Sequence, residues 1–143
     1  MSVRRYGSGG PWEEIFGYSR VVAAGPWLVT AGCTSTVDGV VTNVGDAAGQ
    51  TRQAFRIALE ALAQAGASVE HVVRTRMYVV NTSDADAVGR AHGEIFGAVK
   101  PASTMVMVAA LIDPAHLVEV EVDAYLPQPP RRPKIPSIMT WRS

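Results

Sequence analysis

Hydrophobic residues change their spacing along the chain, and each spacing predicts a different kind of element. Two short apolar runs, at 19–24 and 27–33, flank Gly25-Pro26 and predict a hairpin whose turn is fixed by the proline. β-Branched residues on both sides of Asp38-Gly39 predict a second, tighter hairpin, because this turn needs residues with positive φ. The first 17 residues are rich in glycine, and their pattern predicts no element.

The spacing becomes helical after Asp46. Over about 47–65 the apolar residues recur at helical spacing and a polar stripe follows the opposite side, which predicts a helix with Asp46 as its N-cap. A second helix is predicted to begin at Ser83 and to end before Lys100-Pro101. The apolar stripe of this second helix consists of Val88, Ala91, Ile95 and Phe96.

Two later segments alternate between apolar and polar residues, as strands do. The segment 72–80 has one face with Val73, Thr75, Met77 and Val79, and another with Arg74, Arg76 and Tyr78. The segment 117–126 alternates more sharply, because acidic residues occupy every second position from Glu119.

A third segment, 103–110, is mostly apolar on both faces and also predicts a strand. Its parity favours placing Ser103, Met105, Met107 and Ala109 on the same face of the sheet as Glu119.

The elements follow the order β-β-(β)-α-β-α-β-β. Because strand–helix–strand crossovers are almost always right-handed, both helices should cover the same face of one sheet. The chain is therefore predicted to be an α+β two-layer sandwich with one sheet face left uncovered. Either further copies of the chain cover that face, or it is a solvated face with a few apolar residues.

Composition narrows the class of protein. A chain of 143 residues is long enough for one domain, and 48% hydrophobic residues exclude a disordered chain. The longest apolar run, eight residues from Met105, is far too short to span a membrane, and no secretory signal is expected at the N-terminus. Cys33 is the only cysteine, so a reducing, cytoplasmic location is expected. Three scattered histidines and no phosphate-binding glycine loop predict neither a metal nor a cofactor.

Charge divides the chain into an acidic domain, 1–126, and a basic, proline-rich tail, 127–143. The tail carries four basic residues and no acidic one, which leaves 9 basic and 13 acidic residues in the domain. An acidic surface binds phosphate backbones poorly, so nucleic acid is not an expected partner. The tail is predicted to pack as an extended arm or to be disordered.

Six motifs, in order and at matching spacing over about 11–126, resemble the RidA family, also called YjgF or L-PSP. They are Gly17-Tyr18-Ser19-Arg20, Thr30-Ala31-Gly32, Gly49-Gln50-Thr51-Arg52-Gln53-Ala54, Val72-Val73-Arg74-Thr75, Lys100-Pro101-Ala102 and Val118-Glu119-Val120-Glu121. The resemblance implies a chorismate-mutase-like fold with a mixed six-stranded sheet and two helices on one face. It also implies a homotrimer that binds small metabolites in clefts between subunits.

Members of this family typically hydrolyse enamines and imines to 2-oxo acids and ammonia, and the resemblance carries over some site residues. Glu119 matches the carboxylate that positions the hydrolytic water. Tyr18 and Gly32 match residues of the cleft. Cys33, beside Gly32, is interpreted either as a reactive thiol or as a small buried residue.

The sequence departs from the family at Ser103, where the deaminases have an arginine that binds the substrate carboxylate. A serine offers one neutral donor instead of a guanidinium, so efficient 2-imino acid deamination is not expected. Met105 and Met107 are expected to make the pocket more apolar. Arg20 or Arg76 either replaces the missing cation near Glu119 or pairs with acidic residues of the sheet.

Two functions are compatible with these residues. The first is hydrolase or deaminase-like acid–base chemistry on a small metabolite, with Glu119 transferring the proton. The second is a non-catalytic ligand-binding or regulatory homotrimer that uses the same cleft. Ribonuclease action, which an old family name suggests, is disfavoured by the acidic domain.

Overall fold

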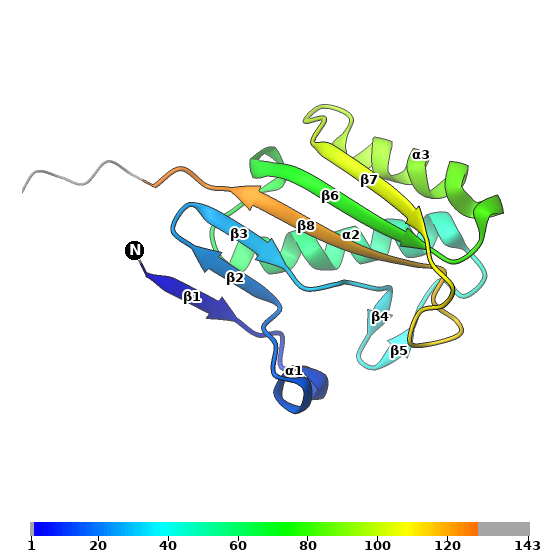
Figure 1. Ribbon diagram of the computed structural model, residues 1–143, viewed down its shortest axis with the longest axis horizontal. Coiled ribbons are helices and arrows are strands. Elements are labelled where there is room, and N and C mark those ends of the chain that lie inside the picture. The colour runs from blue at the N-terminus through cyan, green and yellow to red at the C-terminus, as the bar shows by residue number, and fades with distance from the viewer. Residues whose placement is uncertain (1, 129–143) are drawn as a thin grey trace, which may run out of the picture.

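The computed structural model describes residues 2–128, and six of its strands form one sheet in the order β1-β2-β3-β8-β6-β7 (Figure 1). These strands are β1 (Val3–Tyr6), β2 (Val21–Ala24), β3 (Trp27–Thr30), β6 (Val72–Val79), β7 (Ala102–Met107) and β8 (Val118–Tyr125). The helices are α1 (Pro11–Phe16), α2 (Ala47–Gln64) and α3 (Ala85–Phe96), and two short 3₁₀ turns, Val69–His71 and Thr82–Asp84, precede β6 and α3. A separate two-stranded hairpin, β4 (Thr36–Val37) and β5 (Val40–Val41), joins β3 to α2.

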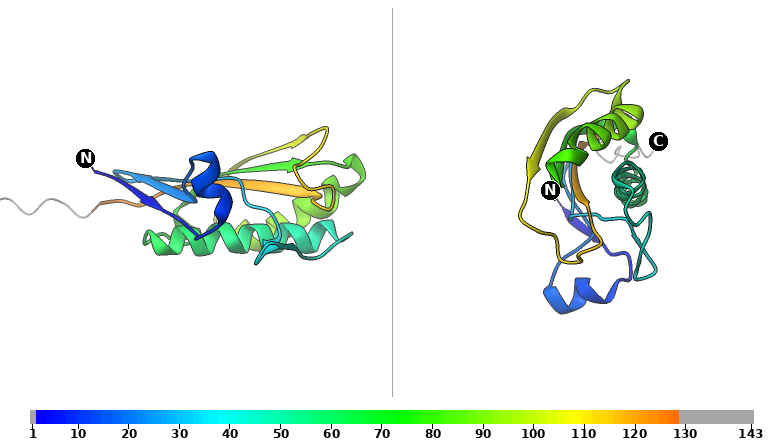
Figure 2. Two further views of the ribbon diagram at one scale, coloured as in Figure 1. Left: turned by 90° about the horizontal axis from the view of Figure 1, so that it is seen from below. Right: turned by 90° about the vertical axis from the view of Figure 1, so that its right-hand side faces the viewer.

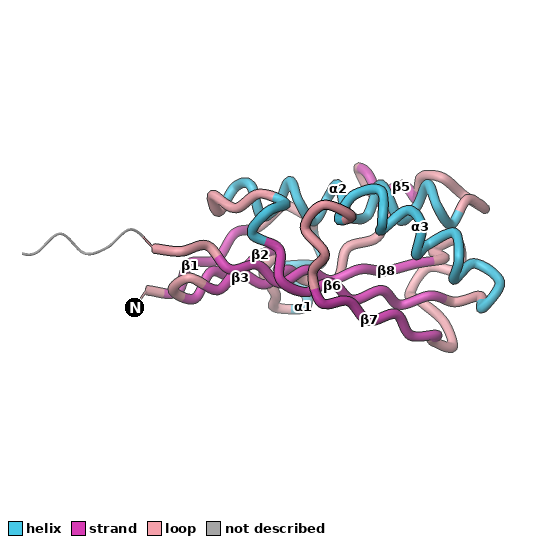
Figure 3. Tube along the Cα trace, turned by 90° about the horizontal axis from the view of Figure 1, so that it is seen from above, coloured by secondary structure: helices cyan, strands magenta, loops and turns pink. Residues whose placement is uncertain are grey.

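Both long helices cover the same face of the sheet. Strands β6 and β7 are parallel and are connected through α3, while all other neighbours in the sheet are antiparallel. Seen along the sheet, α2 and α3 lie on one side of it and α1 stands apart from them (Figures 2 and 3). The predicted α+β two-layer sandwich is therefore confirmed.

Strand β8 positions the core and the site because its residues alternate strictly between two environments. Val118, Val120, Val122 and Ala124 are fully buried beneath the helices, whereas the acidic residues between them face the other side. Helix α2 packs on this buried face through Phe55, Leu62 and several alanines. The small alanine side chains let the helix lie close to the sheet.

The local signals at turns and caps are largely confirmed. The Asp46 side chain accepts a hydrogen bond from Gly49 N at 2.9 Å, as an N-cap should. Asp38 and Gly39 have φ of 50° and 77°, which is the backbone that the tight β4–β5 hairpin requires. Ser83, in contrast, does not cap α3, because it lies inside the 3₁₀ turn that precedes this helix.

The structure corrects the prediction for β7. In the parallel pairing with β6, Ser103, Met105 and Met107 are paired with Thr75, Met77 and Val79, which are buried on the helix-covered face. The three residues therefore lie on that face, and the prediction that they share the uncovered face with Glu119 was wrong. The segment is apolar on both sides, so its hydrophobic pattern carried no information about its orientation.

Two further predictions were wrong or incomplete. A register shift between Val72 and Arg74 turns Val73 out of the apolar face, and this valine is exposed. The glycine-rich N-terminal segment contains both β1, the sixth strand of the sheet, and the short helix α1. Most of the predicted tail, residues 129–143, lies outside the described residues.

The sheet face away from α2 and α3 combines charged and large apolar residues. Among residues 2–128, its exposed apolar side chains are Val3, Trp27 (51% exposed), Val29, Val106 and Tyr125. Trp27 and Tyr125 stack edge to face at 5.1 Å between ring centres. Large aromatic and aliphatic side chains on one open β-surface are typical of an interface.

Candidate functional site

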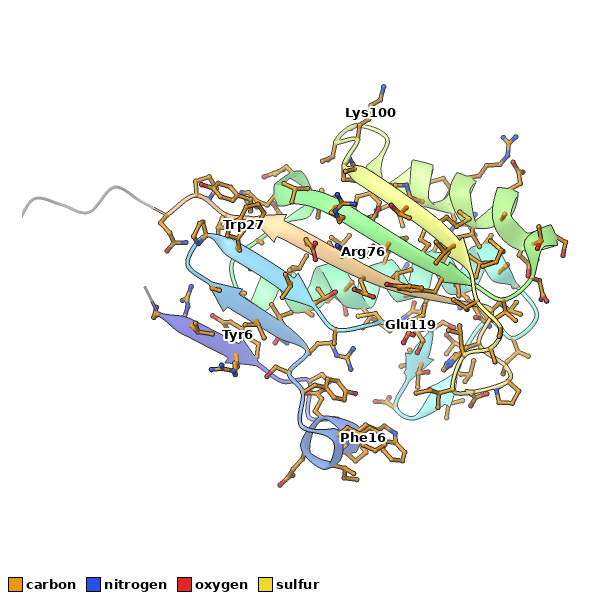
Figure 4. All side chains as sticks on the ribbon, in the orientation of Figure 1. Tyr6, Phe16, Trp27, Arg76, Lys100 and Glu119 are labelled. Carbon is orange, nitrogen blue, oxygen red and sulfur yellow. The ribbon has the colours of Figure 1, made fainter. Side chains whose placement is uncertain are left out.

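The predicted catalytic residue, Glu119, lies near one end of β8, where its carboxyl group touches the loop after β3 (Figure 4). A Cβ atom placed on Gly32 would be only 2.8 Å from Glu119 Oε1 and 2.9 Å from Cδ. The loop is held in register with β8 because Cys33 and Val120 exchange two backbone hydrogen bonds. A side chain at position 32 would therefore displace the Glu119 carboxyl group from its place against the loop.

Arg20 connects the loop after β3 to the N-terminal segment. Its Nη1 donates a hydrogen bond to Gly32 O at 2.7 Å and lies 3.6 Å from Cys33 Sγ. Its Nη2 is 3.8 Å from a carboxylate oxygen of Glu13, and its guanidinium lies 5.6 Å from the centre of the Tyr18 ring. The structure therefore brings Tyr18, Arg20, Gly32, Cys33 and Glu119 together around one part of the β3 loop.

The electrostatic environment of Glu119 favours its neutral form. Burial raises the pKa of this carboxyl group, and Glu121 raises it further, while His116 and Arg20 lower it in part. A carboxyl group with a raised pKa can both donate and accept a proton closer to neutrality than an ordinary glutamate can. Burial also raises the pKa of Cys33, which keeps the thiol protonated despite the nearby guanidinium.

His116 completes the surroundings of Glu119 on the side of the β4–β5 hairpin. Its Nε2 lies 2.7 Å from Thr36 Oγ1, so the hairpin and the segment before β8 are joined by a hydrogen bond. Neither His116 nor Thr36 was predicted as a site residue. They are 80 positions apart in the sequence, and no local pattern relates them.

Arg76 does not supply a cation to this site. Its Nη1 lies 3.2 Å from Asp123 and 3.8 Å from Glu121, on the open face in the middle of the sheet (Figure 4). Of the two readings of Arg76, the structure supports pairing with acidic residues of the sheet. Arg20 is the arginine that lies close to Gly32 and Glu119.

The predicted binding residues of β7 lie on the opposite face of the sheet from Glu119. Ser103 Oγ accepts a hydrogen bond from Thr75 Oγ1 at 2.8 Å, and Thr75 Oγ1 lies 2.7 Å from His92 Nε2. The Met105 side chain lies close to Gly89 on α3, and Met107 is exposed at the end of the strand. Within a single chain, Ser103, Met105 and Met107 therefore do not join the Glu119 cluster.

Sequence reasoning found Glu119 and its neighbours but did not predict Thr75 as a site residue. The parallel register that sets Thr75 beside Ser103 could have shown their contact. Among the described residues, no group of His, Cys, Asp and Glu is arranged to hold a metal ion. No helix within residues 2–128 combines the length and apolar character of a membrane span.

Glu119 is only partly buried in a single chain. A wide depression of about 640 Å³ lies beside the cluster and is lined by Tyr18, Val22, Val29 and Ala31, among others. Glu119 and Ser103 are not among its lining residues. The depression therefore reaches Tyr18 and Ala31 but not the Glu119 carboxyl group.

Comparison with known proteins identifies the family of this chain. Residues 12–126 match the family model described as Endoribonuclease L-PSP, which covers most of the chain. The chain belongs to the L-PSP (RidA) family. The resemblance found in the sequence is thus confirmed.

Among individual L-PSP family members, the chain is 47% identical over 124 residues to the uncharacterized protein SCO2049 of Streptomyces coelicolor, covering 87% of this chain and 92% of that protein. The crystal structure of Rv2704 from Mycobacterium tuberculosis, a member of the YjgF/YER057c/UK114 family, is similar with a TM-score of 0.79 and 46% identity, covering 87% of this chain and all of that one. A third relative, the 3-aminoacrylate deaminase RutC of Acinetobacter baylyi, is 31% identical over 60% of this chain and 68% of its own length.

Proposed function

We propose that the chain is a homotrimeric hydrolase of the L-PSP family that uses Glu119 for acid–base chemistry on an imine or enamine of a small metabolite. The observation that supports this most directly is the half-buried Glu119 carboxyl group, held against Gly32 and with a raised pKa. The name of the relative RutC, a 3-aminoacrylate deaminase, supports the same class of reaction.

The proposed reaction adds water across a C=N bond. Glu119 accepts a proton from the attacking water as the C–O bond forms and passes it to the nitrogen, which gives a carbinolamine. Glu119 then takes the proton of the new hydroxyl group and passes it to the amine. The C–N bond breaks, ammonia leaves, and the C=O bond forms. An enamine enters the same path after protonation at carbon. A group whose pKa lies closer to neutrality performs these transfers more efficiently than an ordinary carboxylate.

The proposed trimer would enclose the Glu119 cluster, which a single chain does not. The open sheet face carries Trp27, Val29, Val106 and Tyr125, which favours burial against another subunit. A cleft between subunits would cover the Glu119 cluster and could place β7 of a neighbour, with Ser103, opposite it. Light scattering of the purified protein should report about three times the 15.2 kDa mass of the chain at micromolar concentration.

The chemical test compares two carboxylates of β8. Ammonia release is measured with 3-aminoacrylate and with imines generated from Ala, Ser and branched amino acids by an amino-acid oxidase. Glu119→Gln should lower turnover by about 10²-fold or more, because a general acid–base group contributes about 10²- to 10⁴-fold. The control is Asp123→Asn, since Asp123 lies on the same face of β8 but pairs with Arg76.

We further propose that imines with a carboxylate next to the C=N bond are poor substrates, because Ser103 provides no positive charge. Archetype-like turnover of such imines would contradict this part of the proposal. Equal activity of the Glu119→Gln and wild-type proteins would contradict the catalytic role of Glu119. Ligand-induced thermal stabilisation that survives Glu119→Gln, together with no turnover on any substrate, would instead favour a ligand-binding or regulatory trimer.

A further inference from the structure

Three polar side chains from three different elements form a hydrogen-bond chain that ends at the edge of the sheet. Thr75 lies on β6 and is fully buried, His92 lies on α3, and Ser103 lies on the edge strand β7 and is exposed. The distance from His92 Nε2 to Thr75 Oγ1 is 2.7 Å, and that from Thr75 Oγ1 to Ser103 Oγ is 2.8 Å. A buried hydroxyl group thus links a half-buried imidazole to a surface hydroxyl group.

The number of hydrogens on each group determines which groups donate and which accept in this hydrogen-bond chain. Thr75 donates its single hydroxyl hydrogen to Ser103 Oγ. It must therefore accept at its contact with His92, which places a hydrogen on His92 Nε2. Among residues 2–128, no side chain or carbonyl accepts the hydrogen of Ser103 itself, so this hydrogen is available to a ligand at the exposed edge. Each donor in such a chain strengthens the next one.

The hydrogen-bond chain from His92 to Ser103 is electrically neutral near neutral pH. The His92 ring packs against Phe55 and Phe96, with ring centres 5.5 Å and 4.7 Å away, and burial lowers its pKa. A neutral imidazole can donate a hydrogen bond through Nε2, but it cannot release that proton, because it would become an imidazolate. Ser103 therefore acts as a hydrogen-bond donor and not as a source of protons.

Nearby cations do not add charge at this edge. Arg74 and Arg76 are paired in register with Ala102 and Thr104, so they lie on the opposite face of the sheet from Ser103. Lys100 belongs to the loop before β7, and its side chain extends away from the sheet (Figure 4). A carboxylate bound at Ser103 would lose its hydration without gaining a charge-assisted hydrogen bond, whereas a carbonyl group loses much less.

We propose that Ser103, oriented by Thr75 and His92, is a donor site for an uncharged carbonyl oxygen, and that the substrate presents an amide group to the β7 edge. This inference rests on the proposed function only in assigning the bound molecule as its substrate. Ser103 is the residue that contacts the ligand, while Thr75 and His92 are positioning residues.

Two probes of nearly equal shape test this preference. Pyruvamide and pyruvate differ only in an amide in place of the carboxylate. Their binding is followed by NMR from the backbone amides of Ser103 and Thr104, in the Glu119→Gln protein, so that loss of turnover does not affect the measurement. Pyruvamide should bind more tightly than pyruvate to this protein, and Ser103→Arg should reverse the order, because a guanidinium makes charge-assisted hydrogen bonds to the carboxylate.

The hydrogen-bond chain is tested by variants that keep the packing of the side chains. Ser103→Ala, Thr75→Val and His92→Phe should each weaken pyruvamide binding by about two- to tenfold, the usual range for one neutral hydrogen bond. Thr75→Ser keeps the hydroxyl group and should bind like the parent protein. In the protein without changes at these positions, ¹⁵N shifts should show the hydrogen of neutral His92 on Nε2, a readout that does not depend on whether a variant folds.

Several results would overturn the inference. A hydrogen on His92 Nδ1 would reverse the chain, and an unchanged affinity in Thr75→Val and His92→Phe would mean that Ser103 acts alone. Tighter binding of pyruvate, or no pyruvamide-dependent shift at Ser103 and Thr104, would refute the carbonyl site. None of these results concerns ammonia release or Glu119, so the proposed acid–base role of Glu119 would stand or fail separately.

Discussion

Replacing Gly32 by alanine tests the contact that defines the Glu119 cluster. The new Cβ would lie 2.8 Å from Glu119 Oε1 and 2.9 Å from Cδ, whereas ordinary contacts begin at 3.4 Å. The carboxyl group must therefore move by about half an ångström, which is at the low end of overpacking and should cost about 1 kcal/mol. For a chain of this size, that corresponds to a fall in Tm of about 3–5 °C.

The cause is isolated by a double-mutant cycle with Glu119→Ala, measured by thermal and urea unfolding at one protein concentration. Without the Glu119 carboxyl group, Gly32→Ala should be neutral or slightly stabilising, because alanine restricts the unfolded chain. The expected coupling between the two positions is about 1–2 kcal/mol. Gly93→Ala serves as the control, since its Cβ would meet no atom within 4 Å and alanine favours the helix. Equal destabilisation of the parent and Glu119→Ala proteins by Gly32→Ala would refute the reasoning.

Two further predictions concern stability. The folded protein favours protonated Glu119, so this residue stabilises it fully below its ordinary pKa of 4.5 and loses that contribution as pH rises through the raised value. The Tm of Glu119→Gln should therefore rise relative to wild type between pH 4 and pH 7, as followed by circular dichroism; a Tm difference that is constant over this range would contradict the raised pKa. Gln50 is fully buried, donates to Ala115 O at 2.9 Å and accepts from Leu117 N at 2.8 Å, so Gln50→Leu should cost about 2–3 kcal/mol in urea unfolding. Gln64→Leu, on the exposed side of the same helix, should change stability little.

The sequence predicts those parts of the fold in which the type of each residue reflects whether that residue is buried or exposed. The alternation of Val118, Val120 and Val122 with acidic residues identified both faces of β8, and Asp46 marked the start of α2. Orientation failed at 103–110, because a strand with apolar residues on both sides looks the same in either orientation. Only the parallel register with β6 resolves it.

The candidate site, like the fold, could be predicted from the sequence only in part. Tyr18, Arg20, Gly32 and Glu119 lie in motifs that resemble a family, and the structure gathers them. The contacts of Arg20 could not be predicted, because its partners are the carbonyl of Gly32 and the carboxylate of Glu13, which depend on how α1 folds back. The chain from Ser103 to His92 likewise depends on the packing of a helix on two strands, a long-range arrangement that no spacing encodes.

The edge position of β7 has a consequence for how the protein is handled. The strand Ala102–Met107 contains no charge and no proline, the two devices by which natural proteins keep an open β-edge from pairing with other chains. The other edge strand, β1, carries Arg4 and Arg5 and is protected by their repulsion. Single chains would therefore tend to aggregate through β7, and substitution of Val106 by lysine should keep them in solution.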